Sequence, residues 1–139
     1  MPANRRNPPG FTRGTVYREV AQLRLEDARV LLESRRFLGA VYLAGYAVEC
    51  LLKYGITRRQ ATLHLPEEFE IHKVDRLMNA AGLSPALQSE TLVAAVFSEI
   101  ADKWGPELRY RTKALSSRDA SRLYDQTVQV YNWVNENVP

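Results

Sequence analysis

Residues 39–53, with the sequence GAVYLAGYAVECLLK, constrain the fold of this chain more than any other segment. Only Glu49 and Lys53 are charged in it. The longest nearly uncharged run, residues 37–52, is shorter than the roughly 20 apolar residues that a helix needs to cross a bilayer. We therefore predict that this segment is a buried core helix.

Small residues recur along this helix, among them Gly39, Ala44 and Gly45. Each glycine weakens an isolated helix by about 1 kcal/mol relative to alanine. Small side chains on one face let another helix approach closely, and we expect this packing to offset the cost. The segment is therefore predicted to be the central element of the fold.

Glu49 and Lys53 stand four residues apart with the acid first, the favourable order for an ion pair on a helix. Both neighbours of Glu49 are apolar, so its carboxylate must find partners or face a cleft. Two interpretations follow. The pair is a buried polar clasp that fixes helix register, or it lines a ligand cleft in which Lys53 or an arginine from residues 109–113 meets a phosphate.

Length and composition indicate one globular domain, since the chain has 139 residues, 45% hydrophobic and 25% charged. The single Cys50 cannot form an intramolecular disulfide, which fits a reducing, cytoplasmic setting. Residues 1–14 contain charge and proline without an apolar core, so they predict a disordered tail and neither a signal peptide nor an anchor. The helical domain is expected over residues 15–137.

Apolar residues recurring every three or four positions predict an all-α, up-and-down bundle of four main helices and one short helix. In the first helix, the predicted inward stripe contains Val16, Val20, Leu23, Ala28, Leu31 and Leu32. The expected helices cover residues 15–34, 39–53, 71–81, 84–103 and 117–137, with a loop over residues 57–70 and a linker over 107–116. Gly82 is the expected C-terminal cap of the short helix, and Ser116 or Ser117 the N-cap of the last.

Basic clusters suggest where a polyanion would bind. The net charge is +3, and the clusters are Arg35-Arg36, Arg58-Arg59 and the run RYRTK at residues 109–113. They form either a phosphate-facing surface or ordinary solvated helix ends. Arg109 and Arg111 flank Tyr110, a combination suited either to clamping phosphate or carboxylate or to tying this linker to the second helix through Glu49.

Other chemistry is weakly supported. The two histidines, His64 and His72, stand in no metal-binding spacing, and the sequence contains no glycine-rich phosphate loop. Cys50 is flanked by Glu49 and Leu51 in a predicted helix, which suggests an inert core thiol. We expect neither a metal nor a cofactor.

Residues 39–53 closely resemble the core helix of HEPN-domain proteins. The stretch HKVDRL at residues 72–77, and Trp104 followed by Arg109-Tyr110, also resemble that family's pattern and occur in the same order. Together these motifs extend the resemblance over roughly residues 20–135.

The resemblance implies a helical bundle that is often dimeric. Family members are commonly encoded beside a minimal nucleotidyltransferase as a toxin–antitoxin pair, or act in RNA-directed defence. Many are metal-independent endoribonucleases, whose site is an arginine followed after four to six residues by a histidine, near the start of the last helix. Other members are regarded as nucleotide-binding or interaction modules.

This sequence departs from the nuclease pattern at the decisive position. Five residues after Arg111 stands Ser116, and no histidine follows His72. Arg58 and Arg59 have the required spacing to His64, but this match lies in the expected loop after the second helix. The ribonuclease site is therefore not carried over.

The leading hypothesis is a HEPN-like homodimer that binds a nucleotide, RNA or a nucleotidyltransferase partner, as one component of a toxin–antitoxin or defence pair. Its candidate ligand-binding residues are Glu49, Lys53, Tyr46, Arg109, Tyr110 and Arg111. The first alternative is a ribonuclease toxin that uses Arg109 or Arg111 with His64 or a partner other than histidine. The second is a purely structural oligomerisation subunit.

Overall fold

The computed structural model describes residues 12–139, and every regular element in that range is a helix. The prediction of an all-α fold is confirmed. The elements are α1 (Gly14–Glu33), α2 (Phe37–Gln60), α3 (Val74–Ala80), α4 (Ser84–Gln88), α5 (Thr91–Lys103) and α6 (Ser117–Asn137), with two 3₁₀ turns, η1 (Glu67–Phe69) and η2 (Pro106–Tyr110). Residues 1–11 of the expected tail lie outside the described range.

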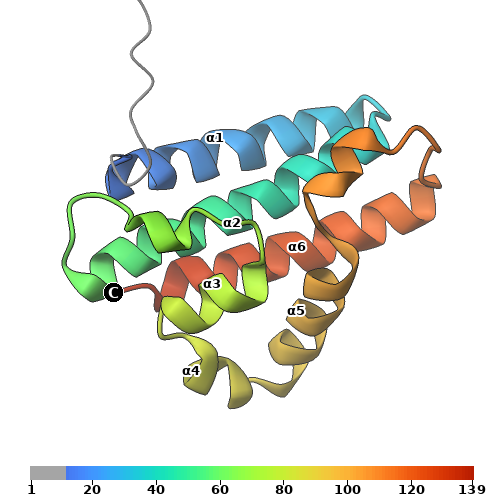
Figure 1. Ribbon diagram of the computed structural model, residues 1–139. Helices are drawn as coiled ribbons and strands as arrows, with labels where there is room; N and C mark the ends of the chain where they lie inside the picture. The colour runs from blue at the N-terminus through green and yellow to red at the C-terminus, as the bar shows by residue number, and fades with distance from the viewer. Residues whose placement is uncertain (1–11) are drawn as a thin grey trace, which may run out of the picture.

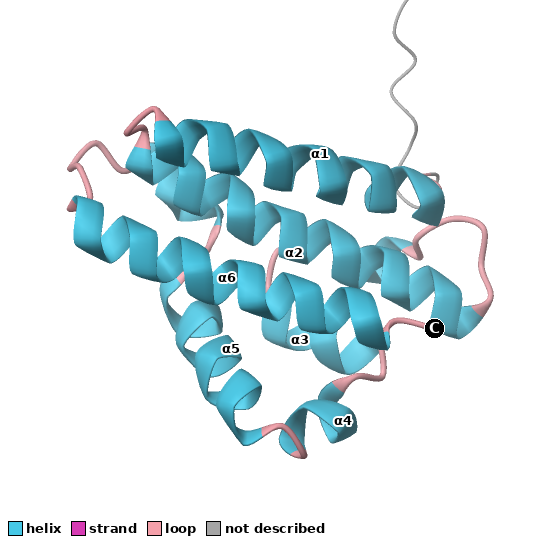
Figure 2. Ribbon diagram, turned by 180° about the vertical axis from the view of Figure 1, so that it is seen from behind, coloured by secondary structure: helices cyan, strands magenta, loops and turns pink. Residues whose placement is uncertain are grey.

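Helix α2 is the centre of the bundle, as predicted. Figure 1 shows α1, α2 and α6 side by side, with α3, α4 and α5 forming a second group against them. Helix α1 runs antiparallel to α2, whereas α6 runs in the same direction as α2. The chain returns through α3–α5 and η2 to the α1–α2 turn before α6 begins, as the view from behind also shows (Figure 2).

The predicted inward face of α1 is partly wrong. Ala21 and Ala28 are fully buried, whereas Val16, Leu23 and Val30 are 42%, 50% and 54% exposed. These three residues are spaced by seven and therefore lie on one outer stripe of the helix. The small alanines let α1 lie close against α2, and this packing turns the larger side chains outward.

Two predicted boundaries are also wrong. Helix α2 continues through Thr57 to Gln60, where a loop was expected, because Thr57 is buried and its carbonyl accepts the N–H of Thr62 beyond the helix end. The expected helix over residues 84–103 is broken into α4 and α5. Glu90 leaves the helical conformation there, in a polar stretch that has no apolar side chain to bury.

Gly45 makes room for Trp104. A Cβ atom at position 45 would lie 2.1 Å from the indole Nε1 of Trp104. That nitrogen donates a hydrogen bond to the carbonyl oxygen of Tyr42 (3.1 Å), and the indole stacks on the Tyr42 ring. At Gly45 the close approach therefore serves a tryptophan from the α5–η2 joint, whereas at Gly39 the neighbour is Leu31 of α1, a helix as predicted.

The predicted caps are confirmed. Gly82 follows α3 with φ +75°, a conformation that favours glycine. The Ser116 hydroxyl accepts a hydrogen bond from the backbone N–H of Asp119 (3.1 Å) at the start of α6. These caps fix where the chain leaves α3 and enters α6.

Within residues 12–139, only α2 has the length and hydropathy of a membrane-spanning helix. In its most apolar window, 67% is buried inside the bundle. The core helix of a soluble protein has the same properties.

The variants Gly45→Ala and Gly39→Ala should have opposite effects on stability. At Gly45 the new methyl group meets the indole, and overpacking of this kind costs about 1–3 kcal/mol. At Gly39 the nearest atom is the Leu31 Cδ1 at 3.4 Å, so alanine should be neutral or stabilise the helix by up to about 1 kcal/mol. Urea unfolding of both variants measures the difference; equal stabilities would contradict the assigned packing.

Candidate functional site

Glu49 and Lys53 form a buried ion pair inside the bundle. Glu49 is 1% exposed and Lys53 6%, and the Lys53 Nζ lies 3.0 Å from the Glu49 Oε2. The Nδ1 of His72 lies 3.1 and 3.2 Å from the two carboxylate oxygens. We call these three residues the Glu49 clasp.

The clasp joins three parts of the chain. Glu49 and Lys53 come from α2, and His72 comes from the segment between η1 and α3. The Lys53 ammonium also lies 5.6 Å from the centroid of the Tyr17 ring on α1. The carboxylate is therefore satisfied by Lys53 and His72, which fits the buried clasp and not a contact with Arg109.

His72 was missed as the partner of Glu49 by sequence reasoning. A carboxylate only accepts hydrogen bonds, so the contact requires a proton on Nδ1 and leaves Nε2 as an acceptor in the neutral ring. The His72 side chain is 52% exposed. The clasp thus has a buried carboxylate and ammonium behind one partly exposed imidazole.

Tyr46 and Cys50 lie beside the clasp on α2. Tyr46 is stacked on Tyr42, with ring centroids 6.4 Å apart. Burial raises the pKa of Tyr46 above its ordinary value, and burial raises the pKa of the Cys50 thiol to about 11. Cys50 is fully buried, so the prediction of an inert core thiol agrees with both observations.

Arg109, Tyr110 and Arg111 form a second, separate group at the end of η2. The Arg109 Nε donates to the Pro106 carbonyl oxygen (3.0 Å), and its guanidinium lies 5.4 Å from the Tyr110 ring centroid. Tyr110 is 78% exposed. The six residues predicted as ligand-binding candidates are therefore divided between the buried surroundings of the clasp and an exposed basic turn.

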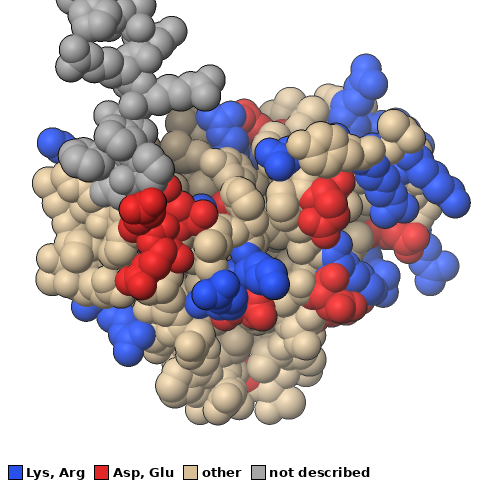
Figure 3. All heavy atoms as spheres, in the orientation of Figure 1, with Lys and Arg blue, Asp and Glu red and all other residues tan. Residues whose placement is uncertain are grey.

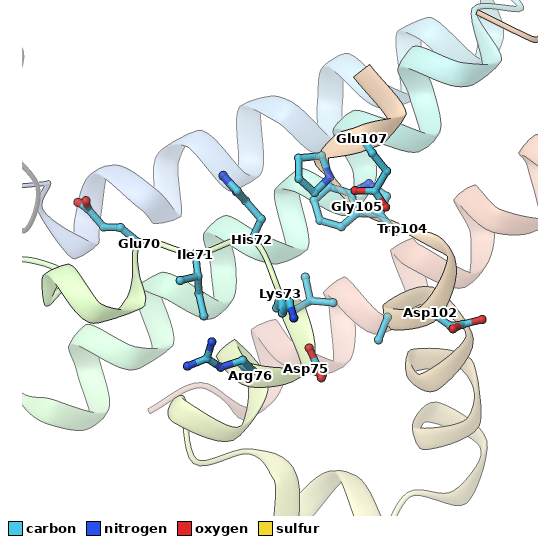
Figure 4. Close-up of a pocket in the computed structure, with 13 residues that line it drawn as sticks. Glu70, Ile71, His72, Lys73, Asp75, Arg76, Asp102, Trp104, Gly105 and Glu107 are labelled. Atoms are coloured by element: carbon cyan, nitrogen blue, oxygen red, sulfur yellow. The ribbon is translucent and has the colours of Figure 1, made fainter. Parts of the chain in front are cut away.

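A cleft of about 680 Å³ lies between the segment preceding α3 and the α5–η2 joint. Figure 4 shows His72, Lys73 and Arg76 on one side and Trp104 and Glu107 on the other. The carboxylates of Glu70, Asp75, Asp102 and Glu107 also line it. Carboxylates outnumber the lysine and arginine, so this cleft does not favour an anionic ligand.

A smaller cleft of about 270 Å³ lies between α5 and α6, and we call it the α5–α6 cleft. Lys103, Arg111 and Arg122 contribute cations to its lining, and Asp119 contributes a carboxylate. Sequence reasoning identified Arg111 but not Lys103 or Arg122, because these two come from different helices and gather only when α5 packs on α6. No local pattern in the sequence brings them together.

One end of the molecule is strongly basic. The α1–α2 turn, η2, the loop after it and the start of α6 meet there, and Figure 3 shows lysine and arginine side chains gathered over this end. We call this surface the basic end, and its residues are Arg35, Arg36, Arg109, Arg111, Lys113, Arg118 and Arg122. The nearby carboxylates are Glu33, Glu99, Glu107 and Asp119, so positive charge is in excess.

The arginine–histidine spacing over residues 58–64, at the C-terminal end of α2, does not form a site in this structure. Arg58 donates to the Pro139 carbonyl oxygen (3.2 Å), and Arg59 donates to the Ala80 carbonyl oxygen (3.1 Å). His64 pairs through its backbone with Arg13. Both arginines therefore have structural partners at the C-terminal end of α2.

The family model described as "HEPN domain" matches residues 16–137. The comparison with curated proteins finds no match, and the comparison with solved structures also finds none. In the described part of the chain, no three His, Cys, Asp or Glu residues gather in a way that could hold a metal ion.

The variant Glu49→Leu should destabilise the fold by roughly 3–5 kcal/mol, because it leaves the Lys53 ammonium buried without a counter-charge. The double variant Glu49→Leu/Lys53→Met should recover much of that loss, since it removes both charges. Urea unfolding of both proteins measures the difference.

Asp27→Ala is the matched control, because it breaks the exposed ion pair with Arg24 (2.8 Å). Such surface pairs contribute about 0.2–1 kcal/mol. A Glu49→Leu protein as stable as the Asp27→Ala protein would show that the clasp does not hold the bundle together.

Proposed function

Because the chain belongs to the HEPN family, whose members include nucleotide- and RNA-related helical modules, we propose that it is an RNA-binding module without the arginine–histidine nuclease site. In this proposal the protein is one component of a toxin–antitoxin or defence pair. The observation that carries the proposal is the basic end, where four neighbouring elements that carry cations meet at one end of the molecule.

The chemistry of the basic end suits single-stranded RNA. Guanidinium groups bind phosphate oxygens through paired hydrogen bonds. Tyr110 presents an exposed ring beside Arg109, and a base that stacks on such a ring gains about 1–3 kcal/mol. Arg36, Arg111 and Lys113 have no side-chain hydrogen bond or ion pair within residues 12–139, so binding them to phosphate breaks no existing contact.

The positions of the two histidines support binding without cleavage. His72 is held by the buried carboxylate of Glu49, and the sequence has no histidine after it. His64 lies near the C-terminal end of α2, whereas η2 lies near its N-terminal end (Figure 1). Within one copy of the chain, Arg109 and Arg111 therefore have no histidine beside them.

The proposal includes a cytoplasmic homodimer that associates with a nucleotidyltransferase partner. HEPN domains commonly form dimers. The outer stripe of α1, formed by Val16, Leu23 and Val30, is an exposed apolar face that pairing of two copies would cover. Sedimentation equilibrium measures this directly; a monomer at all concentrations would contradict the dimeric part of the proposal.

The double variant Arg36→Ala/Lys113→Ala should bind single-stranded RNA more weakly than the unchanged protein. Each lost phosphate contact should lower the slope of log affinity against log salt by about 0.7. Fluorescence anisotropy with a labelled oligonucleotide at several salt concentrations measures both effects. The same samples, analysed on a denaturing gel, report any cleavage.

Arg24→Ala is the control, since it removes one exposed arginine from α1, outside the basic end. It should change the salt dependence little. A folded protein that binds no RNA at low salt would disprove the proposal, and cleavage that disappears in Arg109→Ala would support the ribonuclease alternative instead.

A further inference from the structure

The lining of the α5–α6 cleft combines apolar side chains with cations. Its apolar side chains come from α2, α5 and α6, namely Val41, Ile100 and Leu123, and from η2 and the loop that follows, namely Leu108 and Leu115. The cations of Lys103, Arg111 and Arg122 come from three different elements.

The charges that line the cleft are only partly neutralised. Glu99 accepts a hydrogen bond from Lys103 (2.6 Å) and lies 3.8 Å from Arg122, but it is not part of the cleft lining. Asp119 is the one carboxylate in the lining. Arg111 has no hydrogen bond or ion pair in the described range, so its guanidinium is available to an incoming anion.

Cations beside apolar side chains suit a phosphate group that carries an organic substituent. Three cations and one carboxylate line the cleft, a formal excess of two positive charges, which equals the charge of a phosphate monoester and exceeds that of an internal phosphodiester. The volume of about 270 Å³ suits one terminal nucleotide, whose sugar and base would contact the apolar part of the lining.

We propose that the α5–α6 cleft binds the terminal phosphate monoester of an RNA strand, with Lys103, Arg111 and Arg122 around the phosphate. This inference rests on the RNA binding proposed above and names the part of the RNA that the site distinguishes. The rest of the basic end contacts the strand that leads away from the cleft.

The test compares RNA oligonucleotides that are identical except at their ends. One carries a 5′-phosphate, one a 3′-phosphate and one hydroxyl groups at both ends. At fixed ionic strength, one of the phosphorylated strands should bind the full-length protein at least about tenfold more tightly than the hydroxyl strand, a difference of about 1.4 kcal/mol. Which strand binds tightly identifies the end that the cleft takes.

Arg111→Ala and Arg122→Ala should each reduce this preference to about twofold or less. Lys113→Ala is the matched control, because this lysine belongs to the same loop as Arg111 but does not line the cleft. This variant should lower the affinity for all three strands equally and leave the preference for the phosphorylated strand unchanged. Thermal unfolding of each variant confirms that the bundle is intact.

Equal affinity for the three strands would overturn the inference and leave the proposed RNA binding standing. Loss of the preference in Lys113→Ala but not in Arg111→Ala would overturn the location of the site. A free nucleoside monophosphate that competes as strongly as the phosphorylated strand would show that the strand contributes nothing, and would overturn the assignment to RNA ends. Failure of every strand to bind would disprove the proposed function itself.

Discussion

The contact among Glu49, Lys53 and His72 joins α2 to two other parts of the chain. A carboxylate and an ammonium are placed where water does not reach them, so each needs the other and the carboxylate needs a further donor. That donor is His72, which fixes the segment before α3 against α2. The ammonium also faces Tyr17, so α1 is tied to the same point.

The buried charges of Glu49 and Lys53 are thus separate from the exposed charges of the basic end. The charges inside α2 are satisfied within the bundle, and they are not available to a ligand without losing their partners. The arginines and lysines of the basic end are exposed, and several lack partners of their own. The separation explains why the candidate residues on α2 and those on η2 do not form one site. It also places the proposed RNA contacts where binding requires no rearrangement of the core.

The helical class, the central position of α2 and the caps at Gly82 and Ser116 could be predicted from local patterns, because apolar spacing and capping chemistry are properties of short segments. The outward face of α1 could not. Ala28 belonged to the predicted inward stripe together with Val16 and Leu23, but only packing against α2 shows that small alanines are buried there while the larger residues face outward.

The candidate site could likewise be predicted from the sequence only in part. Glu49 and Arg111 were identified as unusual within their own segments, the first as a charge among apolar residues and the second in a basic cluster. The partners His72, Lys103 and Arg122 come from distant segments, and their positions depend on how the chain crosses α2 and how α5 packs on α6. No spacing in the sequence encodes those distances.

The claim that ligand chemistry lies at the basic end, and not at the Glu49 clasp, is tested most directly by mapping backbone amide shifts in two-dimensional NMR during titration with a short single-stranded RNA. The account predicts shifts over residues 35–36 and over residues 103–122, which include the start of α6. The amides around Glu49 and Lys53 should change little. Shifts concentrated around the clasp and the cleft lined by His72 would contradict it.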